Sequence, residues 1–438
     1  MSEGGSQAAV TAAGLVVVAQ GDLVGMTRGK AVPRADLERV AGAGIGWVPA
    51  NMMLDPFGGI APNAWGPTGE LSLRPDPADL LSIERPGVPA PFQLVLADAF
   101  LAAEPWIACP RGLLKRTLAE VEEATGCEVV SAFEHEFQLD PDCPSPHQDA
   151  FSPHALSAAE PFPSDLVGVL TAAGFAPEMV FSEFGSRQFE VPCGPAVGPA
   201  GADRALLLRE TVREVARWHG RRASFTPLAP GAGVGNGVHI HLSLQGVDGA
   251  QPLAALAEDG EVGELGRSFV AGIVAHADAL CALTAPSPIS YGRLGPGHWS
   301  AAYAAVGGAN REVLVRVVGG GSPHVEYRAA DATANPYLAL GAIVAAGTDG
   351  VRRNMRPLRR HDDDLAALDQ TERERRGVRP LPATLEDALR SFEADEVIDA
   401  WMPTPLRDAF LAMKSHELAL AAEMSSQSEV GEAYGRVY

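Results

Sequence analysis

The chain has 438 residues, of which 46% are hydrophobic and 20% charged, and its formal net charge is −21. Such a composition is ordinary for a globular protein with a sizeable core, and the negative charge disfavours nucleic acid and anionic membranes as partners because phosphates attract Lys and Arg. Five widely spaced cysteines without a CxxC pair argue against a disulfide framework or a zinc knuckle, and they fit a cytoplasmic protein.

The first quarter of the chain is predicted to form short strands separated by Gly and Pro. These strands are Gly14–Ala19, Ile45–Val48 and Phe92–Leu96. The character of the sequence changes at Pro110, after which helical spacing continues over Arg111–Thr125. We therefore predict two domains, residues 1–108 and residues 109–438.

The second predicted domain mixes strands and helices. Its predicted strands are Cys127–Leu139, Gly237–Leu244, Glu312–Val318 and Val325–Arg328, and its clearest predicted helices are Asp203–His219 and Glu261–Leu283. The order lacks a regular alternation of strand and helix, so an α+β fold is favoured. The longest apolar run, Tyr337–Gly347, is too short to cross a bilayer, which takes about 20 residues.

Two glutamates lie two residues apart in the first predicted strand of this domain. Alternate residues of a strand share a face, so Glu134 and Glu136 point the same way. Neighbouring carboxylates repel each other unless a cation lies between them. By itself, however, the pair fits an exposed strand edge better than a metal site.

Two further segments add possible ligands. Glu183 and Glu190 flank a turn that Gly185 permits, and His239 and His241 share one face of the next predicted strand. The two histidines alone fit either zinc or a half-buried strand face, but no Cys lies nearby and the other candidates are carboxylates. A set rich in oxygen ligands suits Mg²⁺ or Mn²⁺.

Four arginines follow in glycine-containing segments of the chain. They are Arg293, Arg311, Arg316 and Arg328. The planar guanidinium group binds carboxylates and phosphates through two parallel hydrogen bonds. Each arginine alone fits an ordinary surface ion pair. The joint occurrence of all these segments in so acidic a chain indicates a site for anionic substrates.

At these residues the chain resembles the glutamine synthetase family, from about Asp22 to the C-terminus. The ordered series of motifs is E-x-E-F, E-x₄-Q-x-E, G-x-H-x-H-x-S, S-Y-x-R-L-x-P-G, N-R-x₄-R, and E-x-R followed by A-N-P-Y-L. Such a series is highly specific. The resemblance implies a small N-terminal β-grasp-like domain and a large catalytic domain whose curved antiparallel sheet is flanked by helices.

The resemblance also implies ATP and two or three divalent ions, Mg²⁺ or Mn²⁺, as cofactors. The implied ligands are Glu136, Glu183 and Glu190 for the metal near the acid substrate, and Glu134, His239 and Glu326 for the metal on the ATP phosphates. The implied ATP-binding residues are His241, Ser243, Arg311, Arg316 and His324, and the implied substrate-binding residues are Arg293, Arg328, Gly235 and Trp299.

Three residues, two of them already named, would take part in catalysis. Arg311 would stabilise the transferring phosphoryl group, and Glu326 would act at the ATP phosphates. Asp55 would come from the N-terminal domain of a neighbouring subunit and help the amine to lose its proton. The resemblance therefore implies a homo-oligomer of stacked rings, commonly a dodecamer, with active sites between subunits.

Three positions depart from the family pattern. Trp299 stands where members that use ammonia carry a glutamate, and an indole offers an apolar or cation–π wall that suits a bulkier amine. The alternative is that Trp299 only packs within the flap. Val234 replaces an asparagine that contacts the glutamate backbone, and His324 replaces an arginine near the ATP phosphates.

These features predict an ATP-dependent ligase that joins the γ-carboxylate of glutamate to a primary amine other than ammonia, through a γ-glutamyl phosphate. The chain looks like the branch of the family that makes γ-glutamylpolyamines and related γ-glutamyl amides, with polyamine, ethanolamine or alkylamine as the amine. Three alternatives remain: an amide ligase for another acid, an ordinary glutamine synthetase, and a catalytically silent scaffold. Six intact metal ligands argue against the last.

Overall fold

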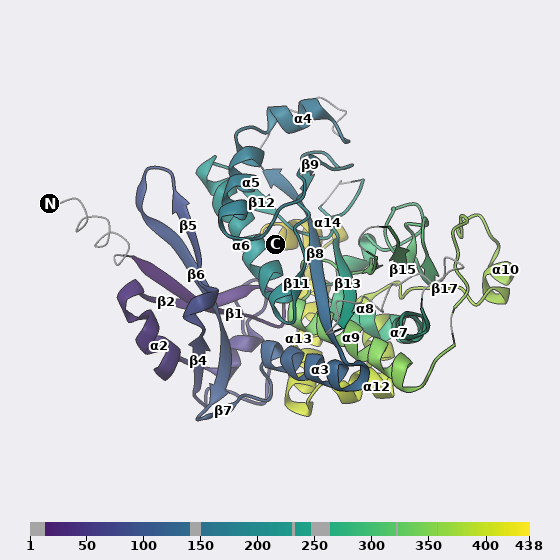
Figure 1. Cartoon of the computed structure of the whole chain (residues 1–438), viewed down its shortest axis with the longest axis horizontal. Coiled ribbons are helices and arrows are strands. Elements are labelled where there is room, and N and C mark those ends of the chain that lie inside the picture. Colours follow the sequence, from purple (N-terminus) through teal and green to yellow (C-terminus); the bar gives the residue numbers. More distant parts are fainter. Residues whose placement is uncertain (1–13, 141–149, 230–232, 247–262, 321–322, 357) are drawn as a thin grey trace.

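The computed structural model describes residues 14–140, 150–229, 233–246, 263–320, 323–356 and 358–438. Figure 1 shows a largely β unit from the N-terminal part of the chain beside a larger unit of mixed strands and helices. Residues 261 and 262, the start of the helix predicted at Glu261–Leu283, lie outside the described residues.

The N-terminal unit is built on a sheet of seven strands. Its strands are β1 (Leu15–Gly21), β2 (Thr27–Pro33), β3 (Ile45–Trp47), β4 (Leu71–Pro75), β5 (Leu81–Arg85), β6 (Val88–Leu101) and β7 (Glu104–Pro105). The order is β2-β1-β6-β4-β3, and β5 and β7 also pair with β6. Strand β1 runs parallel to β6, which is the longest strand of this unit. Because β1, β4, β5 and β7 all pair with β6, this strand connects most of the sheet. One α-helix, α2 (Leu37–Ala43), and three short 3₁₀ turns, η1 (Arg34–Asp36), η2 (Pro49–Met53) and η3 (Pro77–Asp79), complete the described unit.

The larger unit is built on a sheet of ten strands. Its strands are β8 (Cys127–Asp140), β9 (Phe181–Ser182), β10 (Gln188–Glu190), β11 (Ala196–Val197), β12 (Arg222–Ser224), β13 (Val238–Gly246), β14 (Tyr303–Gly307), β15 (Val313–Val318), β16 (His324–Tyr327) and β17 (Arg379–Pro380). The order is β17-β14-β15-β16-β13-β8-β10-β9, and β11 and β12 also pair with β8. Strand β8 is therefore the centre of the sheet.

Helices of the larger unit surround this sheet (Figure 1). They are α3 (Pro110–Thr125), α4 (Pro153–Ala158), α5 (Phe162–Ala172), α6 (Ala200–Trp218), α7 (Glu264–Ala275), α8 (Ala277–Thr284), η4 (Ser290–Gly292), α9 (Pro336–Arg352), α10 (Gln370–Arg375), α11 (Leu385–Ala394), α12 (Glu396–Trp401), α13 (Thr404–Glu423) and α14 (Gln427–Gly435). Helix α9 begins at a capped end, because the Asn335 side chain accepts hydrogen bonds from two backbone amides and Pro336 occupies the first turn.

The predicted α+β class is confirmed, with one correction to the sheet. The second sheet is mixed rather than antiparallel, because β14 runs parallel to β15. The chain between these two strands, residues 308–312, carries Arg311 of the predicted site, and β17 then pairs with β14 on its other side. The boundary predicted at residue 108 falls between β7 and α3 and stays a prediction.

The helix predicted at Glu261–Leu283 is broken. Helices α7 and α8 meet at His276 with a bend of 74°. The His276 ring is buried between two carboxylates, with Nδ1 2.7 Å from Asp395 and Nε2 3.1 Å from Asp349. Within the described residues no single helix is long and apolar enough to span a membrane, although this bent pair passes that test by length and composition.

Buried polar contacts join the two units. The Asn335 side chain donates to the carbonyls of Gly21 and Asp22, at 3.2 and 2.9 Å. Arg209 on α6 donates to the Gly25 carbonyl at 2.7 Å, and Arg111 on α3 bonds Asp98 of β6 at 3.0 Å. Because buried polar groups are costly to leave unpaired, these contacts fix the N-terminal unit against the larger sheet.

The His276 contacts predict a pH dependence of stability. Burial alone would lower the pKa of His276, but the hydrogen bonds that its ring donates to Asp395 and Asp349 outweigh burial and raise the pKa. The contribution of His276 to the free energy of unfolding is therefore complete below its unfolded-state pKa of about 6.5, and it is lost as pH rises through its folded-state pKa. We expect Asp395→Asn, which keeps an oxygen to cap α12, to cost about 1.5 kcal/mol at pH 6 and much less at pH 9.

Urea unfolding at one fixed protein concentration measures this difference. Arg390→Gln, which removes a charged residue from the exposed surface of the neighbouring helix α11, serves as control and should change stability equally at both pH values. A constant cost of Asp395→Asn across this range would contradict the assignment.

Candidate active site

The central strand β8 separates a core face from a site face. Its odd-numbered residues from Cys127 to Leu139 are buried, and the intervening residues are half-buried or exposed. Phe133 and Phe137 therefore anchor the strand in the core, while Glu134 and Glu136 extend from the opposite face. The period-2 pattern thus places both carboxylates on one face, as the sequence predicts.

Three glutamates meet beside β8 in a group called here the carboxylate cluster, Glu136, Glu183 and Glu190. Glu190 on β10 lies directly opposite Glu136 in the antiparallel register, and Glu183 follows β9. One oxygen from each of the three carboxylates lies within 4.8 Å of the others, a spacing that can hold a metal ion.

The carboxylate cluster is electrostatically costly without a cation. Burial, followed by the charges of Glu134 and Glu136, raises the pKa of Glu190 to about 12. Burial and the charge of Glu136 raise the pKa of Glu183 to about 7. Like charges this close cannot all ionise alone, so the arrangement fits a divalent cation that neutralises them.

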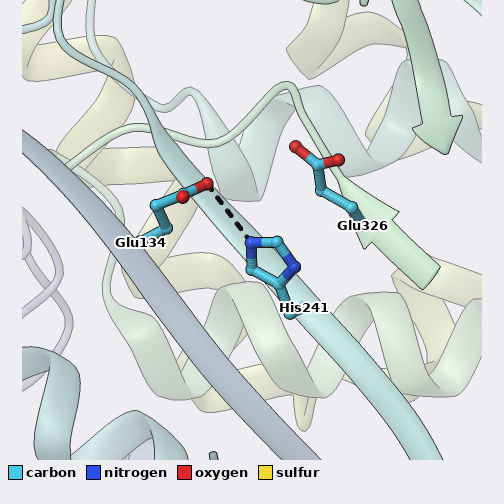
Figure 2. Close-up of side chains that lie close together, drawn as sticks. All are labelled: Glu134, His241 and Glu326. Carbon is cyan, nitrogen blue, oxygen red and sulfur yellow. Dashed lines mark hydrogen bonds and ion pairs between the residues drawn. The ribbon is translucent and has the colours of Figure 1, made fainter. Parts of the chain in front are cut away.

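A second group, the histidine cluster, contains Glu134, His241 and Glu326. Figure 2 shows Glu134 from β8 and His241 from β13 directed toward each other, with Glu326 from β16 across from them. The His241 Nε2 atom lies 3.3 Å from Glu134 Oε2, and Glu326 stands opposite His241 in the β13–β16 register. Ligand atoms of all three lie within 4.8 Å of one another.

His239, the predicted third ligand, also faces the histidine cluster. Its Nδ1 atom lies 3.0 Å from Glu134 Oε2 and 3.6 Å from Glu326 Oε1. The structure therefore brings together the predicted set of Glu134, His239 and Glu326 and adds His241, which the sequence had assigned to the nucleotide. Both histidines reach the cluster because they alternate along one face of β13.

Two of the predicted arginines hold Glu326. Arg316 Nη1 lies 2.5 Å from Glu326 Oε2, and Arg328 Nη1 contacts the other oxygen. Burial opposes ionisation of Glu326, but His239 and Arg328 lower its pKa overall. Arg311 is exposed, and its charge acts on both Glu183 and Arg316. The arginines thus flank both clusters.

Arg293 is buried and bound to the backbone. Its Nη2 atom donates to the carbonyls of Ala329 and Ala330 at 2.8 and 2.7 Å. A side chain at Gly235 would collide with the Pro227 carbonyl oxygen at 2.1 Å and with Arg293 Cγ at 2.8 Å, so glycine is required there. Arg293 and Gly235 are therefore neighbours.

Asp55, Trp299 and Ser243 lie outside the two clusters. The Asp55 carboxylate accepts from the amides of Phe57 and Gly59 and pairs with His416 at 3.0 Å. Trp299 is 70% exposed with a left-handed φ of 56°. Ser243 is buried on β13, two residues beyond His241. None of these contacts tests the role predicted for the residue.

The sequence reasoning gave no role to Gln188, although it quoted the residue within a motif. Its Nε2 atom donates to the Gly235 carbonyl and to Asn236 Oδ1, both at 2.9 Å, and lies 3.3 Å from Glu136 Oε2. Gln188 therefore ties the Gly235 turn to the carboxylate cluster. Its place two residues before Glu190, on the same strand face, was the available signal.

Two groups that could each hold a cation lie on one sheet and are flanked by arginines, an arrangement suited to bringing anionic substrates together. Comparison with known protein families gives two matches that together cover most of the chain. The profile of the glutamine synthetase catalytic domain matches residues 107–433, and that of the glutamine synthetase N-terminal domain matches residues 5–104. The chain belongs to the glutamine synthetase family, whose members are ATP-dependent ligases that use divalent metal ions.

Relatives within the family differ in their named activities. The chain is 35% identical to gamma-glutamylpolyamine synthetase GlnA3 of Streptomyces coelicolor, over 92% of this chain and 89% of that protein. It is 31% identical to glutamine synthetase of Pyrococcus horikoshii, over 86% of this chain and 83% of that protein.

Solved structures give the same family. One described as a novel glutamine synthase homolog has a TM-score of 0.87 at 43% identity, covering 97% of this chain and 98% of that one. GmaS in complex with ADP has a TM-score of 0.84 at 28% identity, covering 98% of each chain.

The carboxylate cluster predicts the outcome of one substitution. Glu190→Gln removes a ligand charge, so we expect Mn²⁺ affinity at one site to fall at least about tenfold, given that loss of an outer-shell partner alone costs about 10–100-fold. Glu128→Gln, on the same strand and face but remote from the cluster, should leave both sites unchanged. Titration of free Mn²⁺ by electron paramagnetic resonance measures both variants, and equal affinities would refute the cluster as a metal site.

Proposed function

We propose that this protein forms a γ-glutamyl amide from glutamate and a primary amine other than ammonia, with ATP and Mg²⁺ or Mn²⁺ as cofactors. The observation that carries the proposal is the pair of clusters on one sheet face, with Arg316 and Arg328 beside them. A chain without catalytic activity would have no need to keep two charged clusters half-buried at such electrostatic cost.

The proposed chemistry has two steps. The γ-carboxylate of the acid attacks the γ-phosphorus of ATP to give an acyl phosphate and ADP, and the amine then displaces phosphate and loses a proton. Bound divalent ions would neutralise the anions that must meet. Arg311 and Arg316 would bind the transferring phosphoryl group, while Arg293 and Arg328 would orient the acid.

The amine preference is proposed from the surroundings of Trp299. The Trp299 carbonyl accepts from Arg328 Nη2 at 3.1 Å, and the next residue, Ser300, donates to the Arg293 carbonyl at 2.6 Å. The segment is thus tied to both arginines assigned to the acid, which supports a role for the indole beside the reacting end. An aromatic wall favours an alkyl or cationic amine over ammonia, and the identity to GlnA3 supports a polyamine.

The acid is proposed to be glutamate, with another carboxylic acid as the alternative. The Cγ2 atom of Val234 lies close to Gly185, only 2.8 Å from the position that a Cβ atom on Gly185 would occupy. Val234 therefore presents methyl groups next to the loop of Glu183, where an asparagine would offer hydrogen bonds to an amino acid backbone. This feature alone favours the alternative acid, so acids should be compared directly.

Asp55 is proposed to act in an assembly of stacked rings. In the single chain its carboxylate accepts hydrogen bonds from two amides and pairs with His416. The adjacent Phe57 and Ile60 are exposed hydrophobic residues. These two side chains fit burial against another subunit, which would bring the Asp55 loop beside a neighbouring site.

Release of phosphate tests the proposal. With ATP, Mg²⁺ and glutamate, we expect release to depend on a primary amine such as putrescine, ethanolamine or methylamine, and to exceed release with ammonia. The product is identified by its mass as the γ-glutamyl amide. Release with ammonia alone would favour an ordinary glutamine synthetase, release only with another acid would favour the alternative ligase, and no release would favour a scaffold.

The Trp299 assignment has its own test. Replacing Trp299 with glutamate restores a carboxylate that pairs with ammonium, so the ratio of kcat/KM for ammonia to that for the preferred amine should rise about tenfold, or about 1.4 kcal/mol. Trp299→Phe keeps an aromatic wall and should retain the original preference. If both variants shift the ratio equally, the aromatic ring does not determine the choice of amine.

A further inference from the structure

His324, the first residue of β16, lies beside the histidine cluster. Its Nε2 atom is 3.0 Å from Nδ1 of His241, and the two rings meet edge to face with centroids 5.0 Å apart. On its other side, His241 directs Nε2 toward Glu134 Oε2 at 3.3 Å. Both ring nitrogens of His241 are therefore engaged, one by His324 and one at the proposed cation position.

The chemistry of imidazole makes the identity of residue 324 important. A metal ion binds a ring nitrogen that carries no proton, and the neutral ring keeps its one proton on the other nitrogen. For His241 to ligate through Nε2, its proton must lie on Nδ1 and needs an acceptor there. Nε2 of His324 is placed to accept it, whereas an arginine at this position could only donate.

We propose that His324 is a positioning residue that holds His241 in the tautomer that ligates a metal ion. The ion at the histidine cluster then has imidazole ligands from His239 and His241 beside the carboxylates of Glu134 and Glu326. Of the two ions proposed as cofactors, Mn²⁺ is the transition-metal ion and accepts imidazole ligands more readily than Mg²⁺ does. This position therefore favours Mn²⁺ over Mg²⁺, while the carboxylate cluster offers oxygen ligands only. The inference rests on the metal site of the proposed function and extends it to metal choice.

Three substitutions of His324 separate the effects of acceptor, charge and ring. His324→Gln retains a neutral acceptor, His324→Leu removes the acceptor without adding charge, and His324→Arg supplies only donors. Each variant is titrated with Mn²⁺ alone, without nucleotide, and the free ion is followed by electron paramagnetic resonance. Binding of Mn²⁺ at the carboxylate cluster is measured in the same titration and shows whether each variant is folded.

We expect His324→Leu and His324→Arg to weaken Mn²⁺ binding at one site by about 10–100-fold, as loss of an outer-shell partner does. His324→Gln should stay within about threefold of the parent, because its amide oxygen still accepts a hydrogen bond. The Mn²⁺ affinity of the carboxylate cluster should be unchanged in all three variants. Competition with Mg²⁺ should show a smaller preference for Mn²⁺ in the leucine and arginine variants.

Two results would overturn the proposal. Equal affinity in the leucine variant and the parent would show that no acceptor is needed at this position. Equal loss in the glutamine and leucine variants would show that the ring itself is required, as in direct ligation by His324. Because these titrations contain neither ATP nor amine, they are independent of the phosphate-release assay, and either inference can fail without the other.

Discussion

Repulsion among the glutamates of one sheet face is the constraint on which the site depends. Glu134 and Glu136 share one face of β8, the pairing of β8 with β10 sets Glu190 opposite Glu136, and Glu183 joins them from the adjoining loop. Their charges raise the pKa of Glu190 once burial has removed most of the water. Protonation relieves this cost, but the carboxylates can all ionise together only beside a counter-charge, and this fits the histidines and arginines that share the sheet surface with them.

Much of the fold and of the site could be predicted from periodicity and the motif series. The alternation in β8 is strict, so the shared face of Glu134 and Glu136 followed from spacing alone. Partners distant in sequence were beyond such reasoning. Glu326 meets His241 through strand register, which has no local signal. The spacing of Gln188 from Glu190 was a local signal for its strand face, but its bonds to Glu136 and to the Gly235 turn depend on the fold.

Two mispredictions have physical causes. The apolar spacing over α7 and α8 is continuous, but His276 finds two carboxylates from other helices and the chain bends there, which no local propensity reveals. The parallel pairing of β14 with β15 was missed because no strand was predicted at β14 and the antiparallel sheet was taken from the family resemblance. The connection between the two strands is also shorter than the crossover that parallel strands usually need. In both cases tertiary contacts override local preference.

Both clusters take a glutamate from the same strand, and this has a consequence for substrate variation. Residues two apart in a strand are separated by roughly 6.6 Å along the strand. The backbone of β8 therefore fixes the spacing between the two proposed ion positions. Loops that carry Trp299 or Val234 can be exchanged to admit other reactants without altering that spacing. A family with this sheet can thus accept different substrates while the spacing between the two proposed ion positions stays constant.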